Sequence, residues 1–231
     1  GRAIVRPPLV VAGDLPEAEL DRWYRRQIAP AAEAMAGTYF ATPPGEPVTI
    51  LLFGTDASYA EHARRLLGRQ RVSRYGHYRP HLRMVIVNAA AGRGPLRHEL
   101  THALMAFDFP DAPDWLAEGL ASLHECCRSS AERPGLVGDV GRRLPVLREA
   151  IRQDRLRPLR SLVGDGDFRR GPAAVSYAQA RYLCLYLQHR GVLRDCYHEI
   201  RDGHADDPRG EKTVRRALGG RPWAQIEAGF E

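Results

Sequence analysis

A pair of histidines, His98 and His102, constrains this chain more than any other feature, and Glu99 directly follows the first of them. Residues four apart on an α-helix share one face, with Cβ atoms roughly 5–6 Å apart, so both imidazoles can bind one ion. Each residue turns the helix by about 100°, which places Glu99 beside such an ion but not on it. The pattern therefore predicts a helix here, and on that helix a zinc site with an adjacent base.

The residues around the pair favour a helix as well. Gly94 and Pro95 precede it, and proline is tolerated at the start of a helix. Apolar residues then recur at helical spacing, at Leu96, Leu100, Ala103, Leu104 and Phe107. The alternative interpretation is a buried helix with two hydrogen-bonded core histidines and a surface glutamate. Both interpretations require the helix, and they differ only in the metal.

The third metal ligand is expected from a second helix. Glu118 is the best candidate, sixteen residues after His102 and four after Asp114, a residue type that commonly caps helices. A carboxylate there can also serve only to complement the helix dipole. Other possible ligands follow on what we expect to be the same helix: His124, Glu125, Cys126 and Cys127. The longer pattern that ends in a third histidine needs glycine and histidine where Met105 and Asp108 stand, which excludes that class.

These motifs resemble those of the gluzincin metallopeptidases, in particular aminopeptidase-N-like domains and the shorter bacterial peptidase-MA-like domains. The resemblance is carried by the histidine pair with Glu99, by residues 115–121 around Glu118, and by residues 176–183. It implies a zincin-like α+β fold and one Zn²⁺ ion held by His98, His102 and Glu118. Glu99 would then be the general base, and Tyr177 the catalytic tyrosine that stabilises the oxyanion.

The resemblance also implies zinc-dependent hydrolysis of peptide bonds in a peptide or protein substrate. In this family an edge strand before the zinc helix pairs with the substrate backbone. Gly76, His77 and Tyr78 are the candidate substrate-binding residues on that edge, although an ordinary hairpin would explain them equally well.

One departure from the family bears on the substrate. Aminopeptidases of the family carry a glutamate on the edge strand that holds the free ammonium group of the substrate. Residues 71–94 contain no carboxylate, and their arginines are Arg71, Arg74, Arg79, Arg83 and Arg93. Because a cationic edge does not attract an ammonium group, we expect an endopeptidase that prefers acidic substrate groups.

We expect one catalytic domain, with a mixed α/β part over residues 1–107 that carries the zinc helix and a mainly helical part over 108–231. Pro7-Pro8 limit the segment 4–11 to an edge strand at best. A helix from Asp14 to about Ala36 should be distorted at Pro30. Strands are predicted at 48–53, 75–78 and 82–87, and further helices at 56–67, 94–107, from 114, and at 144–151, 158–164, 172–189, 192–201, 212–218 and 222–230.

Composition excludes several classes. The net charge of +6 comes from arginines scattered among carboxylates, so we expect no nucleic-acid binding. No apolar run approaches the roughly 20 residues of a membrane span. The sequence does not assign the protein to a cellular compartment. Four cysteines without a CxxC pair permit disulfides but do not demand them. Two other functions stay open: a zinc-binding, non-proteolytic interaction domain with a gluzincin fold, and a basic binding module whose histidine pair is accidental.

Overall fold

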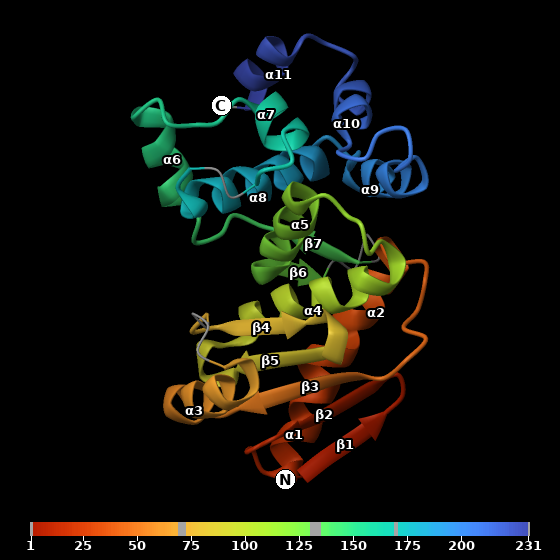
Figure 1. Ribbon diagram of the computed structural model, residues 1–231, viewed down its shortest axis with the longest axis vertical. Helices are drawn as coiled ribbons and strands as arrows, with labels where there is room; N and C mark the ends of the chain where they lie inside the picture. The colour runs from red at the N-terminus through yellow and green to blue at the C-terminus, as the bar shows by residue number, and fades with distance from the viewer. Residues whose placement is uncertain (1, 69–72, 130–134, 169–170, 231) are drawn as a thin grey trace. The chain divides into compact units, whose positions relative to one another are not determined.

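The computed structural model describes residues 2–68, 73–129, 135–168 and 171–230, and its architecture is α+β, as predicted (Figure 1). The chain divides into two compact units. The first comprises residues 1–110 with 129–136, and the second comprises residues 111–128 with 137–231.

A mixed five-stranded sheet forms the centre of the first unit, in the order β1-β2-β3-β5-β4. β2, β3 and β5 run parallel to one another, whereas the two outer strands β1 and β4 are antiparallel to their neighbours. The strands span Arg2–Arg6 (β1), Leu9–Gly13 (β2), Val48–Phe53 (β3), Gly76–Arg79 (β4) and Met84–Asn88 (β5). The strands predicted before the histidine pair are thus confirmed, and β4 lies at an edge of the sheet.

The prediction for the first residues was wrong in one respect. Residues 4–11 were expected to be an edge strand at best, but β1 and β2 form a hairpin, and β2 is an inner strand paired with both β1 and β3. Pro7 and Pro8 lie in the turn between the two strands, where no ladder hydrogen bond is needed from them. Proline therefore separates two strands here and does not weaken either.

The two faces of the sheet are covered differently. Val11, Ile50 and Val87 are fully buried on one face, where α1 (Glu17–Trp23) packs against β1 and β2, and α4 (Arg93–Asp108) packs against β4 and β5. On the other face α3 (Asp56–Leu67) packs through a cluster of buried residues, Phe53, Tyr59, Ala63, Leu67 and Ile86.

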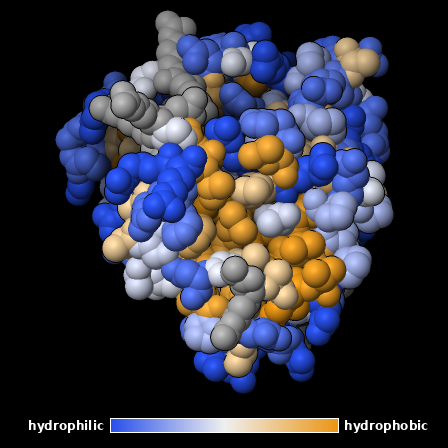
Figure 2. All heavy atoms as spheres, turned by 60° about the horizontal axis from the view of Figure 1, so that its bottom comes forward, coloured by the Kyte–Doolittle hydropathy of each residue, from blue (hydrophilic) through white to orange (hydrophobic). Residues whose placement is uncertain are grey.

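α3 covers its face of the sheet only in part. Val5 pairs with Val10, and Leu51 with Ala12 and Ile86, so their side chains point to the same side as α3. Val5 is 58% exposed. Figure 2 shows an apolar patch on this side of the molecule. An apolar sheet face is therefore left open to solvent beside α3.

The first helical segment begins later than predicted. Asp14 does not cap it; its carboxylate accepts hydrogen bonds from the Gly54 amide at 2.8 Å and from the Ser58 hydroxyl, and so ties the end of β2 to α3. α1 is followed by a π-helical turn, Tyr24–Ile28, and then by α2, Ala29–Thr38. The distortion expected at Pro30 thus occurs just before it, where the helix adjusts to the missing amide donor.

The second unit is mainly helical. Its helices are α5 (Asp114–Glu125), α6 (Leu144–Arg152), α7 (Leu159–Gly164), α8 (Ala173–His189), α9 (Leu193–Asp202), α10 (Glu211–Ala217) and α11 (Trp223–Phe230). Two short strands, β6 (Cys127–Ser129) and β7 (Leu136–Gly138), form a separate two-stranded sheet.

A tight helix contact holds α5 against α8. A Cβ added at Gly119 would lie 2.7 Å from the carbonyl oxygen of Ala180 and 2.7 Å from Sγ of Cys184. The absence of a side chain at Gly119 therefore allows the two helices to approach closely, because larger residues would separate them. The indole nitrogen of Trp115, near the start of α5, donates to the carbonyl of Arg209 at 2.8 Å.

None of the four cysteines forms a disulfide. Among the described residues, none of the helices combines the length and the apolar character that crossing a bilayer requires.

Candidate metal centre

The predicted histidine pair lies on α4, a regular sixteen-residue helix. Leu96 and Leu100 are fully buried on the face towards the sheet. His98, Glu99 and His102 are each half-buried. Burial of its apolar face against the sheet thus stabilises α4, and the three polar side chains lie on another face of the helix.

The two imidazoles face each other through the same ring nitrogen. Nε2 of His98 lies 3.2 Å from Nε2 of His102. In a tetrahedral site with zinc–nitrogen bonds of 2.0–2.1 Å, two ligand nitrogens are about 3.3 Å apart. The pair is therefore already spaced as two ligands of one ion would be.

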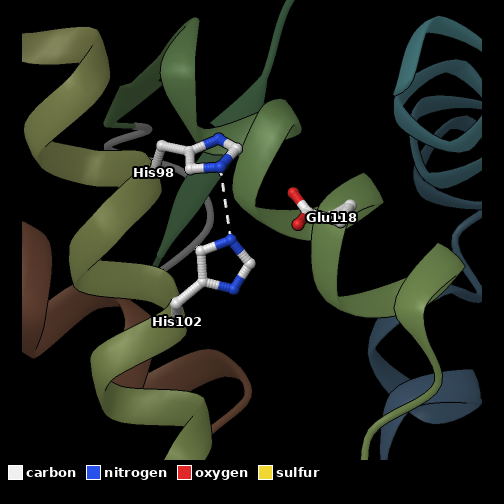
Figure 3. Close-up of side chains that lie close together, drawn as sticks. All are labelled: His98, His102 and Glu118. Atoms are coloured by element: carbon white, nitrogen blue, oxygen red, sulfur yellow. Dashed lines mark hydrogen bonds between the residues drawn. The ribbon is translucent and has the colours of Figure 1, made fainter. Parts of the chain in front are cut away.

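Glu118 completes this group. One ligand atom from each of His98, His102 and Glu118 lies within 4.8 Å of the other two. Figure 3 shows the side chains, the imidazoles one turn apart on α4 and the carboxylate from α5. Among the residues that the structure describes, this is the one group of three or more such side chains close enough to share an ion. Two imidazoles and one carboxylate form a donor set that fits zinc and leaves a fourth position open.

The competing ligands are occupied elsewhere. α5 ends at Glu125, so Cys126 and Cys127 do not continue the helix, which corrects the prediction. Their thiols donate to the carbonyls of Val140 and His124 respectively. Glu125 pairs with Arg142 and Arg143, and the His124 side chain is fully buried. The structure therefore brings Glu118, and none of these four, to the histidine pair.

Glu99 lies against the edge strand β4. A Cβ added at Gly76 would lie 2.9 Å from Cγ and 3.3 Å from Oε1 of Glu99. The charge of the Glu99 carboxylate also acts on Tyr59. Burial raises the pKa of the Tyr59 phenol most, and the charge of Glu99 raises it further. The Tyr59 hydroxyl donates to the carbonyl of Ser73 at 2.6 Å. The carboxylate of the candidate base thus sits beside the start of β4.

β4 pairs with β5 alone among the described strands. An edge strand offers backbone N–H and C=O groups along its outer side to an extended peptide. Gly76 is buried, whereas His77 and Tyr78 are half-buried. Burial raises the pKa of Tyr78, with an opposing effect from Arg83. The three residues predicted to bind substrate therefore lie on a strand that has a free edge.

One arginine near this edge is paired with a carboxylate. Arg83 forms an ion pair of 2.7 Å with Glu46 and so does not add a free cation. Arg71 lies outside the described residues. Arg74 lies 5.2 Å from the ring centroid of Tyr75, as a cation over an aromatic face.

Tyr177 lies in the first turns of α8 and is half-buried. It shares a helical stripe with Ala180 and Cys184, the residues that contact Gly119 of α5. Its ring packs edge-to-face on Phe168, with centroids 5.3 Å apart, and lies under the guanidinium of Arg143 at 5.2 Å. Tyr177 is thus on the side of α8 that faces α5, with its ring held on two sides.

No motif in the sequence points to Phe168 and Arg143, the two residues whose side chains contact the ring of Tyr177. Nη2 of Arg143 in turn donates a hydrogen bond to Oε1 of Glu125 at 2.9 Å, and the Glu125 side chain is 9% exposed. These residues are far apart in the chain, and no local pattern signals their contact.

Two comparisons with known proteins were negative: no protein-family model matches this chain, and a search of curated proteins finds no match.

Proposed function

We propose that this chain is a zinc-dependent peptidase of the gluzincin type, with a zincin-like fold, and that it cleaves peptide bonds inside chains. The observation that carries the proposal is the convergence of His98, His102 and Glu118. Glu99 follows directly after His98 on α4. When such a sequence motif arises by chance, no third ligand is expected beside the two histidines. Here the Glu118 carboxylate lies close to both imidazoles.

One zinc ion would be held by the two Nε2 atoms and the Glu118 carboxylate. When bound, the ion would supply Lewis-acid activation of water and of the substrate carbonyl. The chain contributes two neutral ring nitrogens and one negative charge, so the loaded site would keep a net positive charge that favours electron-rich oxygen ligands.

Glu99 would act as the general base and then as the general acid. Its side chain stands beside Gly76, next to the strand where a peptide would lie. It would take the proton from the attacking water and pass it to the leaving amine, and proton transfer of this kind contributes about 10²–10⁴-fold to a rate.

The substrate would extend the sheet along β4, with its backbone hydrogen-bonded to the free edge near Gly76, His77 and Tyr78. The described residues 73–94 include no carboxylate that could hold a free ammonium group. This absence on the edge favours cleavage within a chain over removal of the first residue.

The Tyr177 hydroxyl would donate a hydrogen bond to the oxyanion that forms during attack. Phe168 and Arg143 limit the motion of its ring, so that the donor would be oriented before the reaction.

A peptide-library digest with parent protein and the Glu99→Gln variant tests the proposal. The substitution keeps all three proposed ligands, so both proteins should contain zinc, and only the parent should cleave. Equal cleavage by both would remove Glu99 as the base. Zinc in both with cleavage by neither would instead favour the non-proteolytic zinc-binding domain.

A further inference from the structure

A second feature of the first unit is a pocket of about 550 Å³ at the ends of β5 and α3. α3 supplies one wall, and the other wall is the segment that leads into β4. Its lining includes Asp56, Tyr59, Arg64, Ser73, Arg74 and Asn88.

The pocket adjoins the start of the edge strand. Arg74 lies two residues before Gly76, the residue that contacts Glu99. The Asn88 backbone amide donates to the carbonyl of Tyr75 at 3.0 Å, and its side-chain amide donates to the carbonyl of Arg74 at 3.1 Å. These bonds fix the segment to the end of β5, so that the pocket opens beside the strand proposed to bind substrate.

Most polar groups of the wall already have partners. The Asn88 side chain also donates to Oδ1 of Asp56 at 2.6 Å and accepts from the Ala90 amide. The Tyr59 hydroxyl donates to the Ser73 carbonyl, and the Ser73 hydroxyl accepts from the Tyr75 amide. These polar groups are therefore already hydrogen-bonded to one another within the walls, and they are not available to bind a ligand.

The two guanidinium groups differ from the rest of the wall. Arg64 and Arg74 are exposed, and neither forms an ion pair with a carboxylate among the described residues. Neighbouring Arg65, by contrast, pairs with Glu61 at 2.8 Å. Asp56 is the single carboxylate of the lining, and Asn88 occupies one of its oxygens. The pocket thus presents two cations against one acid.

We propose that this pocket binds an acidic side chain of the peptide substrate, an aspartate or glutamate carboxylate. This inference rests on the proposed function, because it names the substrate class of the same site. Planar guanidinium groups match the two oxygens of a carboxylate, and a pocket of this volume accommodates one side chain. A peptide extended along β4 would place a side chain near Arg74, where the pocket opens.

The test uses the zinc-loaded Glu99→Gln variant, which should bind substrate without cleaving it. Fluorescent peptides that carry glutamate, and matched peptides that carry glutamine, are titrated against it. We expect the glutamate peptides to bind about fivefold more tightly, a preference that shrinks with added salt. In the Arg64→Gln/Arg74→Gln background the preference should disappear, and in the Arg65→Gln background it should persist.

Equal affinities for the two peptide sets would overturn the inference, and so would a preference that survives loss of both arginines. A phosphoserine peptide that alone binds more tightly would also overturn it, because the ligand would then be a phosphate.

Failure of the function and failure of the pocket give different results. Cleavage by the parent without acid preference would leave the peptidase in place and remove the pocket. Acid-selective binding without any cleavage by the parent would support the pocket and remove the peptidase.

Discussion

Gly76 on β4 lies so close to Glu99 on α4 that an added Cβ would be 2.9 Å from the Cγ atom of the glutamate. The same Cβ would lie 3.2 Å from the carbonyl oxygen of Ile86, so that it could not move towards the sheet. The glutamate side chain is the more flexible neighbour. Any residue larger than glycine at position 76 should therefore displace the proposed base.

Gly76→Ala should lower kcat by about 10²-fold while zinc content stays at the parent level, because a displacement of about 1 Å at the reacting groups costs roughly this much. The measurement is steady-state kinetics together with metal analysis.

The matched control is Gly37→Ala, since nothing lies within 4 Å of a Cβ at Gly37. It should keep the parent kcat. Parent-like activity of Gly76→Ala would contradict the position assigned to Glu99.

Tyr177→Phe should lower kcat by about 10²–10³-fold, the usual effect of losing one oxyanion donor. The ring contacts with Phe168 and Arg143 do not need the hydroxyl, so the free energy of unfolding should change little. Kinetics and urea denaturation measure the two effects separately.

Tyr182→Phe is the control for this prediction. Its hydroxyl bonds the backbone of Gly141, so its loss should reduce stability and leave kcat unchanged. A Tyr177→Phe variant with full activity would assign Tyr177 a packing role only.

Gly119→Ala should reduce the free energy of unfolding by about 1–3 kcal/mol, the usual cost of overpacking a close contact. The added methyl group would meet the backbone of Ala180, which cannot move away as a side chain can. Urea denaturation beside Gly37→Ala checks this, because the control should be neutral or slightly stabilised. Equal stability of both variants would contradict the close packing of α5 against α8 at Gly119.

The sequence predicted the elements that are fixed by local patterns. α4 follows from apolar residues at helical spacing, and α3 from a similar pattern that ends at Gly68, where φ is +72°. β3 and β5 follow from short apolar runs. The two helices could be predicted because each buries one continuous face. The two strands could be predicted because each is a short apolar run whose residues are mostly buried.

The remaining features depend on contacts between distant residues. Asp14 is a common capping residue type, but its carboxylate accepts hydrogen bonds from Gly54, just after β3, and from Ser58 of α3. The contacts of Gly119 with Ala180, and of Arg143 with Tyr177, likewise have no local signature. The sequence predicted the histidine pair and named Glu118 as the best third ligand, but the distances among the three side chains depend on the fold.

Stability should fall in alkaline solution because of Cys196. Burial and, next, the charges of Glu199 and Asp195 raise the pKa of this thiol to about 12. The unfolded chain loses the proton near its ordinary pKa of 9.0, whereas the folded chain keeps it. Above that pH the unfolded state binds fewer protons, so its relative free energy falls as pH rises.

Between about pH 8 and about pH 10.5 the parent should lose about 2 kcal/mol more stability than Cys196→Ala, at about 1.4 kcal/mol per pH unit above the unfolded pKa. Cys126→Ala, at a partly exposed thiol, should behave as the parent does. Urea denaturation at both pH values measures the difference. The same pH dependence in all three proteins would contradict the burial of Cys196.

The most direct measurement is the zinc content of purified parent protein beside His102→Ala and His77→Ala. His77 lies on β4 and is not part of the three-residue group, so it serves as the matched control. The parent and His77→Ala should each hold about one zinc ion per chain, and His102→Ala should lose it, because a site with three protein ligands cannot spare one. Equal zinc content in all three proteins, or none in the parent, would contradict a zinc site built on His98, His102 and Glu118.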